Sequence, residues 1–165
     1  MEFRLTKDFI LHLHRVNNIY EWQQFLQRYL YSHMDDIRYV LENYPYSGGF
    51  AVECAQMSGK CHAEEALQNN GLNYDDYIEF VMDLPQLWSD LMNGKKTDLW
   101  DAFGDGLFEY RRSVSGKRIF RIFFTVQENK IYFFSGFIKK TRSTPQNESR
   151  KAKDLLRQWE KKRKH

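Results

Sequence analysis

The sequence has few of the residues that build disulfide frameworks and metal sites. Among its 165 residues there are two cysteines and five histidines. Cys54 and Cys61 do not form a CxxC pair, so we expect reduced thiols rather than a structural disulfide. Together with His62 and Glu65 they match no spacing typical of zinc ligands, and we expect no metal site. Phosphate-binding loops, dinucleotide fingerprints and nucleophile elbows are also absent, so we expect no cofactor.

Long apolar runs are equally scarce. No stretch approaches the ~20 apolar residues that cross a bilayer. The N-terminus, MEFRLTKDF, has neither the apolar core nor the cleavage site of a signal peptide. The sequence therefore predicts a cytoplasmic protein with no membrane partner. Its length is enough for one compact domain, or for a small domain with an extension.

Charge is divided unevenly along the chain. Residues 1–105 hold 8 Lys and Arg against 17 Asp and Glu, a net charge of −9, whereas residues 106–165 hold 17 against 5, a net charge of +12. A strongly basic half predicts a polyanionic partner. The basic end, residues 150–164, is equally typical of a solvated helix terminus.

Residues 106–145 predict the centre of the fold. They contain three segments rich in Phe, Tyr and Ile, namely GLFEYRR, GKRIFRIFFTV and KIYFFSGFIKKTRSTP. Turn-forming residues separate them at 113–117 (SVSGK) and 127–130 (QENK). Aromatic and β-branched residues bounded by turns are typical of strands, so we predict an antiparallel meander.

Side-chain alternation divides this meander into two faces. In the middle segment Phe120, Ile122 and Phe124 share one face, and Arg121 lies on the other. A lone cation on an apolar strand indicates an anion opposite to it. The first segment is divided in the same way, with Leu107, Glu109 and Arg111 on one side and Phe108, Tyr110 and Arg112 on the other.

Three motifs, in this order, resemble those of a known family. They are residues 106–111 (GLFEYR), a strand that carries Arg121, and residues 136–141 (GFIKKT) followed by Thr144 and Pro145. They are similar to the RelE/HigB superfamily of toxin–antitoxin toxins, and most of all to its phage-derived HigB-like branch. The likeness covers roughly residues 50–152. It implies an α+β fold with a small, mostly antiparallel sheet packed on helices. It also implies a ribosome-dependent mRNA endonuclease, with the ribosome, mRNA and a cognate helix-turn-helix antitoxin as partners.

The resemblance also implies a site. RNA cleavage by a 2′-hydroxyl requires a base, an acid, and cations that stabilise the developing phosphorane charge. The core strands contain no histidine, so proton transfer would depend on Lys, Glu or Tyr. We expect catalytic roles for Arg111, Arg121, Lys139 and Lys140, with Glu109 or Tyr110 as a weaker choice of acid or base. Nucleic-acid binding is expected from Arg112, Lys117, Arg118, Thr141 and Arg142. A structural ion pair between Arg111 and Glu109 is the alternative.

The rest of the chain predicts helices around this meander. Residues 1–48 are expected to form a helical extension ahead of the toxin domain at 49–165, with a break near Gly48 and Gly49. In the extension, helices are expected over 18–30 and 34–44, and a helix is favoured over a strand for 1–16. Beyond it we expect a strand at 50–57, a helix at 62–67, a helix from Asn73 or Asp75 to Gly94 that Pro85 kinks or breaks, a loop at 95–105 and a helix at 146–164.

Two other functions remain open at this point. One is a ParE-like toxin that inhibits DNA gyrase by binding to it. The other is a non-catalytic module of phage or mobile-element origin that binds RNA or a protein partner. Both would use a basic surface, so the sequence does not separate them from a nuclease.

Overall fold

The structure, a computed structural model, describes residues 3–5, 50–68, 72, 74–139 and 144–163. The helices expected over 18–30 and 34–44 lie outside these ranges. So do Lys140, Thr141 and Arg142. Within the described part of the chain, no helix is both long enough and apolar enough to cross a membrane.

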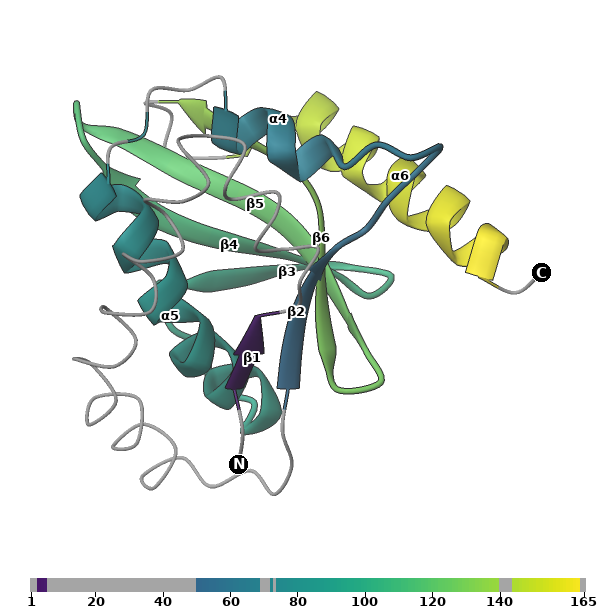
Figure 1. Cartoon of the computed structure of the whole chain (residues 1–165), viewed down its shortest axis with the longest axis horizontal. Coiled ribbons are helices and arrows are strands. Elements are labelled where there is room, and N and C mark those ends of the chain that lie inside the picture. Colours follow the sequence, from purple (N-terminus) through teal and green to yellow (C-terminus); the bar gives the residue numbers. More distant parts are fainter. Residues whose placement is uncertain (1–2, 6–49, 69–71, 73, 140–143, 164–165) are drawn as a thin grey trace.

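One sheet of six strands forms the centre of the described part (Figure 1). Three of its strands make the predicted antiparallel meander of residues 106–145. A fourth antiparallel strand extends this meander at one edge, and two more strands join it in parallel at the other. The fold is therefore α+β with a mostly antiparallel sheet, as expected. In spatial order the strands are β1 (Phe3–Leu5), β2 (Phe50–Cys54), β6 (Lys130–Lys139), β5 (Arg118–Gln127), β4 (Leu107–Val114) and β3 (Trp100–Gly104).

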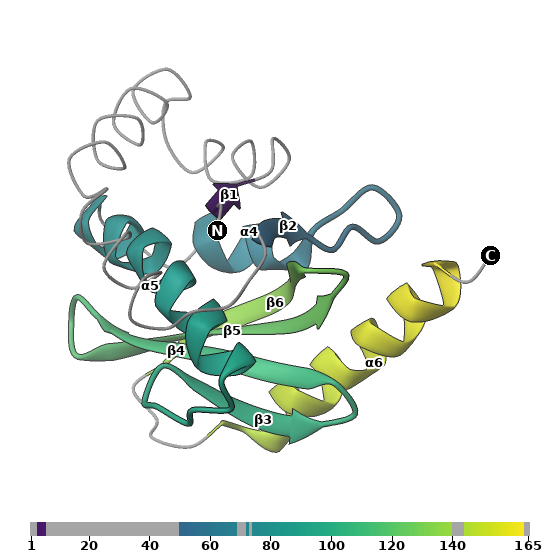
Figure 2. The same cartoon turned by 90° about the horizontal axis from the view of Figure 1, so that it is seen from below.

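Helices cover both faces of the sheet. Helices α4 (His62–Gln68) and α5 (Tyr74–Met92) pack on one face, and α6 (Gln146–Arg163) packs on the other (Figure 2). Two apolar clusters result, because alternate side chains of each strand enter opposite layers. The cluster under α5 includes Phe80, Tyr110 and Phe120, and the cluster under α6 includes Phe123 and Trp159.

The turns between the strands of the meander contain residues with a left-handed backbone. Glu128 and Asn129 join β5 to β6 with φ values of 53° and 61°, which is typical of a two-residue type I′ hairpin. Between β4 and β5, Gly116 and Lys117 have φ values of 78° and 55°. The hairpin between β4 and β5 places Arg111 and Arg121 directly opposite each other.

The predicted break at Pro85 is wrong, because α5 continues through it as one helix of 19 residues. A proline inside a helix removes one hydrogen bond and costs about 3 kcal/mol. Leu84, Leu87 and Trp88 are buried beside Pro85 against the sheet, and each such side chain contributes about 1.5–3 kcal/mol. Packing therefore outweighs the missing bond. The expected stop at Gly94 is confirmed, since Gly94 has a φ of 64° and the Lys95 N–H donates to the Asp90 carbonyl.

Two further expectations need correction. Part of the loop expected at 95–105 is the edge strand β3, which pairs with β4 although Asp101 and Gly104 are residues depleted in strands. Residues 3–5, where a helix was favoured, form β1 and pair in parallel with β2, whose outer edge would otherwise be unpaired. The domain boundary near Gly48 and Gly49 stays a prediction.

Candidate functional site

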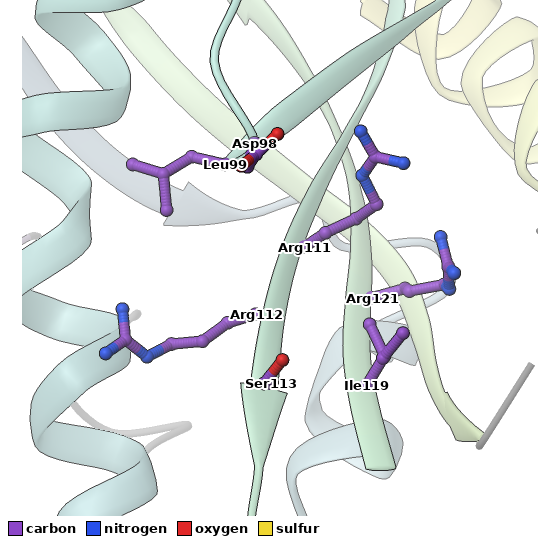
Figure 3. A pocket seen from close by; sticks show the side chains of 7 residues that line it. All are labelled: Asp98, Leu99, Arg111, Arg112, Ser113, Ile119 and Arg121. Atoms are coloured by element: carbon purple, nitrogen blue, oxygen red, sulfur yellow. The ribbon is translucent and has the colours of Figure 1, made fainter. Parts of the chain in front are cut away.

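Two consecutive arginines of β4 point to opposite faces of the sheet. Arg111 lies on the face that α6 partly covers, together with Leu107 and Glu109. Arg112 points away from Arg111, toward a neighbouring helix (Figure 3). It contacts two carboxylates of α5. The alternation predicted from the sequence is confirmed, and it divides the expected site residues between two separate environments.

A buried network lies beneath Arg111 on the α6 face. Arg121 and Glu109 have exposed fractions of 1% and 0%, and the Arg121 Nη1 donates to Glu109 Oε1 at 2.9 Å. The Thr144 hydroxyl donates to Glu109 Oε2 at 2.6 Å and accepts a 3.2 Å bond from Arg121 Nη1. Each carboxylate oxygen of Glu109 therefore accepts a hydrogen bond, and the residue just ahead of α6 is tied to the sheet.

This network explains why an arginine occupies an apolar strand. Like charges directly opposite each other on neighbouring strands repel, and Arg111 and Arg121 are such a pair. Glu109 places a negative charge between them, 2.9 Å from Arg121 and 3.8 Å from Arg111. The anion expected opposite Arg121 is therefore Glu109, which lies on the neighbouring strand of the same sheet. The structural ion pair expected as the alternative forms most closely with Arg121 rather than with Arg111.

Arg111 is bound less tightly than Arg121. Its side chain is 27% exposed, and its Nη2 lies 3.9 Å from Asp101 Oδ2. Its Nε is buried and has no hydrogen-bond partner among the residues that the structure describes. Buried donors are nearly always bonded, so this Nε is an exception.

A cavity of about 410 Å³ lies in front of Arg111. Figure 3 shows Arg111 and Arg121 directed to the same side of the sheet, with Arg112 directed away from them. The sequence pattern did not single out the other lining residues. Two of them could have been found from alternation, since Ser113 follows Arg111 by two positions and Ile119 precedes Arg121 by two. The lining consists of Asp98, Leu99, Arg111, Arg112, Ser113, Ile119 and Arg121.

The other described cations of the expected site lie near the ends of strands. Lys139 ends β6, is exposed, and places its Nζ 3.8 Å from Glu148 and 5.6 Å from the ring centroid of Phe137. Lys117 is exposed in the β4–β5 turn. Arg118 donates from its Nε to the Ser115 carbonyl at 2.9 Å. None of these three lines the cavity in the described part of the chain.

Tyr110 and Arg112 belong to a different cluster, on the α5 face. The Tyr110 hydroxyl and the Arg112 Nη1 both donate to Asp83 Oδ2 at 2.6 Å, and Arg112 Nε donates to Glu79 at 3.1 Å. Burial raises the pKa of Tyr110 well above its usual value, and the neighbouring Asp83 carboxylate raises it further. Burial also raises the pKa of Asp83, against the opposing effect of these hydrogen bonds. The guanidinium of Arg112 is thus directed away from Arg111 and Arg121, although Arg112 also borders the cavity that they line.

A family model matches this chain. The model of the family described as "Phage derived protein Gp49-like (DUF891)" matches residues 72–157, from just before α5 to well into α6. The chain belongs to this family, a family of RelE/HigB-like toxins. Searches of the curated proteins and of the solved structures found no match. Among the described residues, no group of three or more His, Cys, Asp or Glu could hold a metal ion.

Proposed function

We propose that this protein is the toxin of a toxin–antitoxin pair, that it cleaves mRNA on the ribosome, and that a cognate helix-turn-helix antitoxin neutralises it. Membership of the Gp49-like family supports the toxin class. The observation that carries the proposal is the partly exposed side chain of Arg111, which lines a cavity of about 410 Å³. A planar guanidinium with open donors is suited to bind two phosphate oxygens together.

The roles of the site residues follow from their exposure. Arg111 would contact the phosphate and stabilise the charge that develops when the 2′-hydroxyl attacks. Arg121 is too deeply buried to be the first contact, so it would act by positioning Glu109. Lys139, with Lys140 beyond it, would hold the RNA backbone or assist proton transfer.

The two weaker choices of acid or base receive little support. Both oxygens of Glu109 accept hydrogen bonds in a buried network, which suits it to hold cations rather than to remove a proton. The Tyr110 hydroxyl is committed to Asp83 on the opposite face. Proton transfer in this proposal therefore depends on the lysines and on groups that the ribosome supplies.

The test compares Arg111→Ala with Arg112→Ala, two neighbouring changes of equal size on opposite faces. We expect Arg111→Ala to reduce transcript cleavage by ~10²–10³-fold, the effect of removing one preorganised electrostatic donor. Arg112 also borders the cavity, but Asp83 and Glu79 hold its guanidinium, so Arg112→Ala should reduce cleavage far less than Arg111→Ala does. The measurements are growth after induction, mapping of transcript ends in the cell, and cleavage in a purified translation reaction with and without ribosomes.

The same experiment distinguishes the nuclease from the gyrase inhibitor and from the non-catalytic binding module. Growth arrest without cut transcripts, together with inhibition of DNA supercoiling by purified gyrase, would favour the gyrase inhibitor. Binding to RNA with neither arrest nor cleavage would favour the non-catalytic module. Wild-type cleavage by a folded Arg111→Ala protein would remove the proposed site from the nuclease.

A further inference from the structure

Glu109 lies close enough to Arg111 to compete with a ligand for its hydrogen bonds. Its Oε1 is 3.8 Å from the Arg111 Nε, beyond hydrogen-bond distance but within reach of a small side-chain rotation. An Arg111 that turned to bond Glu109 would commit its Nε, which has no hydrogen-bond partner in the described part of the chain. A buried carboxylate beside a binding arginine is thus an internal competitor for the ligand.

Two other groups now occupy this carboxylate. Arg121 bonds Oε1 at 2.9 Å, and the Thr144 hydroxyl bonds Oε2 at 2.6 Å. Both bonds involve a charged partner, and such bonds are stronger than those between neutral groups. Thr144 also accepts from Arg121, so the three side chains fix one another in a single arrangement.

We infer that Thr144 and Arg121 are positioning residues that saturate Glu109 and thereby keep Arg111 available to bind a phosphate. If the Thr144 hydroxyl is removed, Oε2 loses its donor inside the protein, where an unbonded carboxylate oxygen is unfavourable. The Arg111 Nε lies 3.8 Å from Glu109 Oε1, so Arg111 would turn toward Glu109 and away from the cavity. The inference rests on the proposed function only in taking RNA phosphate as the ligand.

The first test replaces Thr144 by a residue of the same shape without a hydroxyl. Thr144→Val should weaken the binding of a short, fluorescein-labelled single-stranded RNA, and of inorganic phosphate, by about tenfold, which is the lower end of the effect of losing one charged hydrogen bond. Thr144→Ser keeps the hydroxyl and should bind both probes as the wild type does. Dissociation constants are measured by fluorescence anisotropy and by calorimetry, with thermal melting as the check on folding.

A second variant separates competition from a merely structural role. In Thr144→Val combined with Glu109→Gln, the competing negative charge is gone, so binding of both probes should return to within a fewfold of wild type. A folded Thr144→Val protein that binds like the wild type would overturn the inference. So would a folded double variant that binds no better than Thr144→Val alone.

A measurement on the unmodified protein covers the case in which the variants do not fold. The Arg111 Nε–H signal in the NMR spectrum, assigned through Arg111→Lys, should shift as inorganic phosphate is added, while the Arg121 Nε–H signal stays in place. A shift of Arg121 without one of Arg111 would overturn the inference. Binding that follows the predicted pattern without transcript cleavage would reject only the nuclease, whereas a wild-type protein that binds neither probe would overturn both proposals.

Discussion

Arg111 and Arg112 are neighbours on one strand, yet they have different partners on the two faces of the sheet. On the α5 face, Arg112 meets Asp83 and Glu79 at 2.6 and 3.1 Å. On the α6 face, Glu109 bonds Arg121 at 2.9 Å and stays 3.8 Å from Arg111. One face therefore uses its arginine to hold a helix, and the other keeps one arginine unsaturated. Unused donor capacity, rather than positive charge as such, distinguishes the candidate site from its surroundings.

The largest expected effect comes from Arg121→Ala. Removing one partner of a buried ion pair leaves an uncompensated charge, which typically costs about 3–5 kcal/mol. We expect the free energy of unfolding in urea to fall by that amount and toxicity to fall with it. Replacing the pair together, with Arg121→Met and Glu109→Leu, should recover most of the stability but no cleavage.

The same variant also tests the direct catalytic role that the sequence predicted for Arg121. If Arg121→Ala melts like the wild type and loses cleavage by ~10²–10³-fold, Arg121 acts on the phosphate itself. Arg121→Lys would then recover only part of the activity, because an ammonium lacks the planar pair of donors.

Arg112→Ala is the matched change on the α5 face. It removes the Arg112 hydrogen bonds to Asp83 and Glu79, so we expect unfolding to become easier by about 1–2 kcal/mol. Cleavage per folded molecule should fall far less than it does in Arg111→Ala. Urea unfolding and transcript cleavage at one protein concentration measure both quantities, and a loss of cleavage larger than tenfold would place Arg112 in the site after all.

The contact between Tyr110 and Asp83 on the α5 face predicts how stability depends on pH. The pKa of Tyr110 is raised above 10.0 by burial and by Asp83, so the folded protein keeps its phenol proton where the unfolded chain releases it. Alkaline pH therefore lowers the free energy of unfolding. The contribution of Tyr110 is fully present below pH ~10 and is lost as the pH rises, by up to about 1.4 kcal/mol per pH unit. Urea unfolding of wild type and Tyr110→Phe between neutral and alkaline pH should show this decline in the wild type alone; parallel curves would contradict it.

The sequence predicted the parts of the site that depend on local pattern. The three strands of the meander and the faces of Phe120, Arg121 and Ile122 follow from a period of two, which is a property of each strand by itself. The family motifs likewise pointed to Arg111 and Arg121. Both predictions needed only residues that are close in sequence.

Interactions between distant elements could not be predicted in this way. Thr144 was recognised only as part of a motif, and its bond to Glu109 spans 35 positions of sequence. The pairing of Glu109 with Arg121 instead of Arg111 depends on the strand register and on side-chain geometry. Strand β3 was missed because the exposed edge of β4, rather than its own composition, makes residues 100–104 extended.

The smallest expected effect concerns the exposed end of α6, far along the helix from Thr144. Lys161 and Lys162 are exposed there, whereas Arg163 lies over Tyr132 and Trp159, with 4.9 and 4.5 Å between its guanidinium carbon and the ring centroids. Lysines in solvent attract the RNA backbone without positioning it, so Lys161→Gln with Lys162→Gln should weaken RNA binding only slightly. The slope of log affinity against log salt concentration should fall by ~0.7 for each RNA phosphate that the variant no longer neutralises.

Arg163→Gln is the control for this pair, because it removes a charge that also packs against the sheet and should lower the melting temperature as well. The sites of transcript cleavage should be the same in all three proteins, since none of these changes touches Arg111 or the cavity in front of it. If the two-lysine variant moved the cleavage sites or abolished cleavage at low salt, the tail of α6 would position the RNA, and the division between an anchoring surface and a reactive arginine would be wrong.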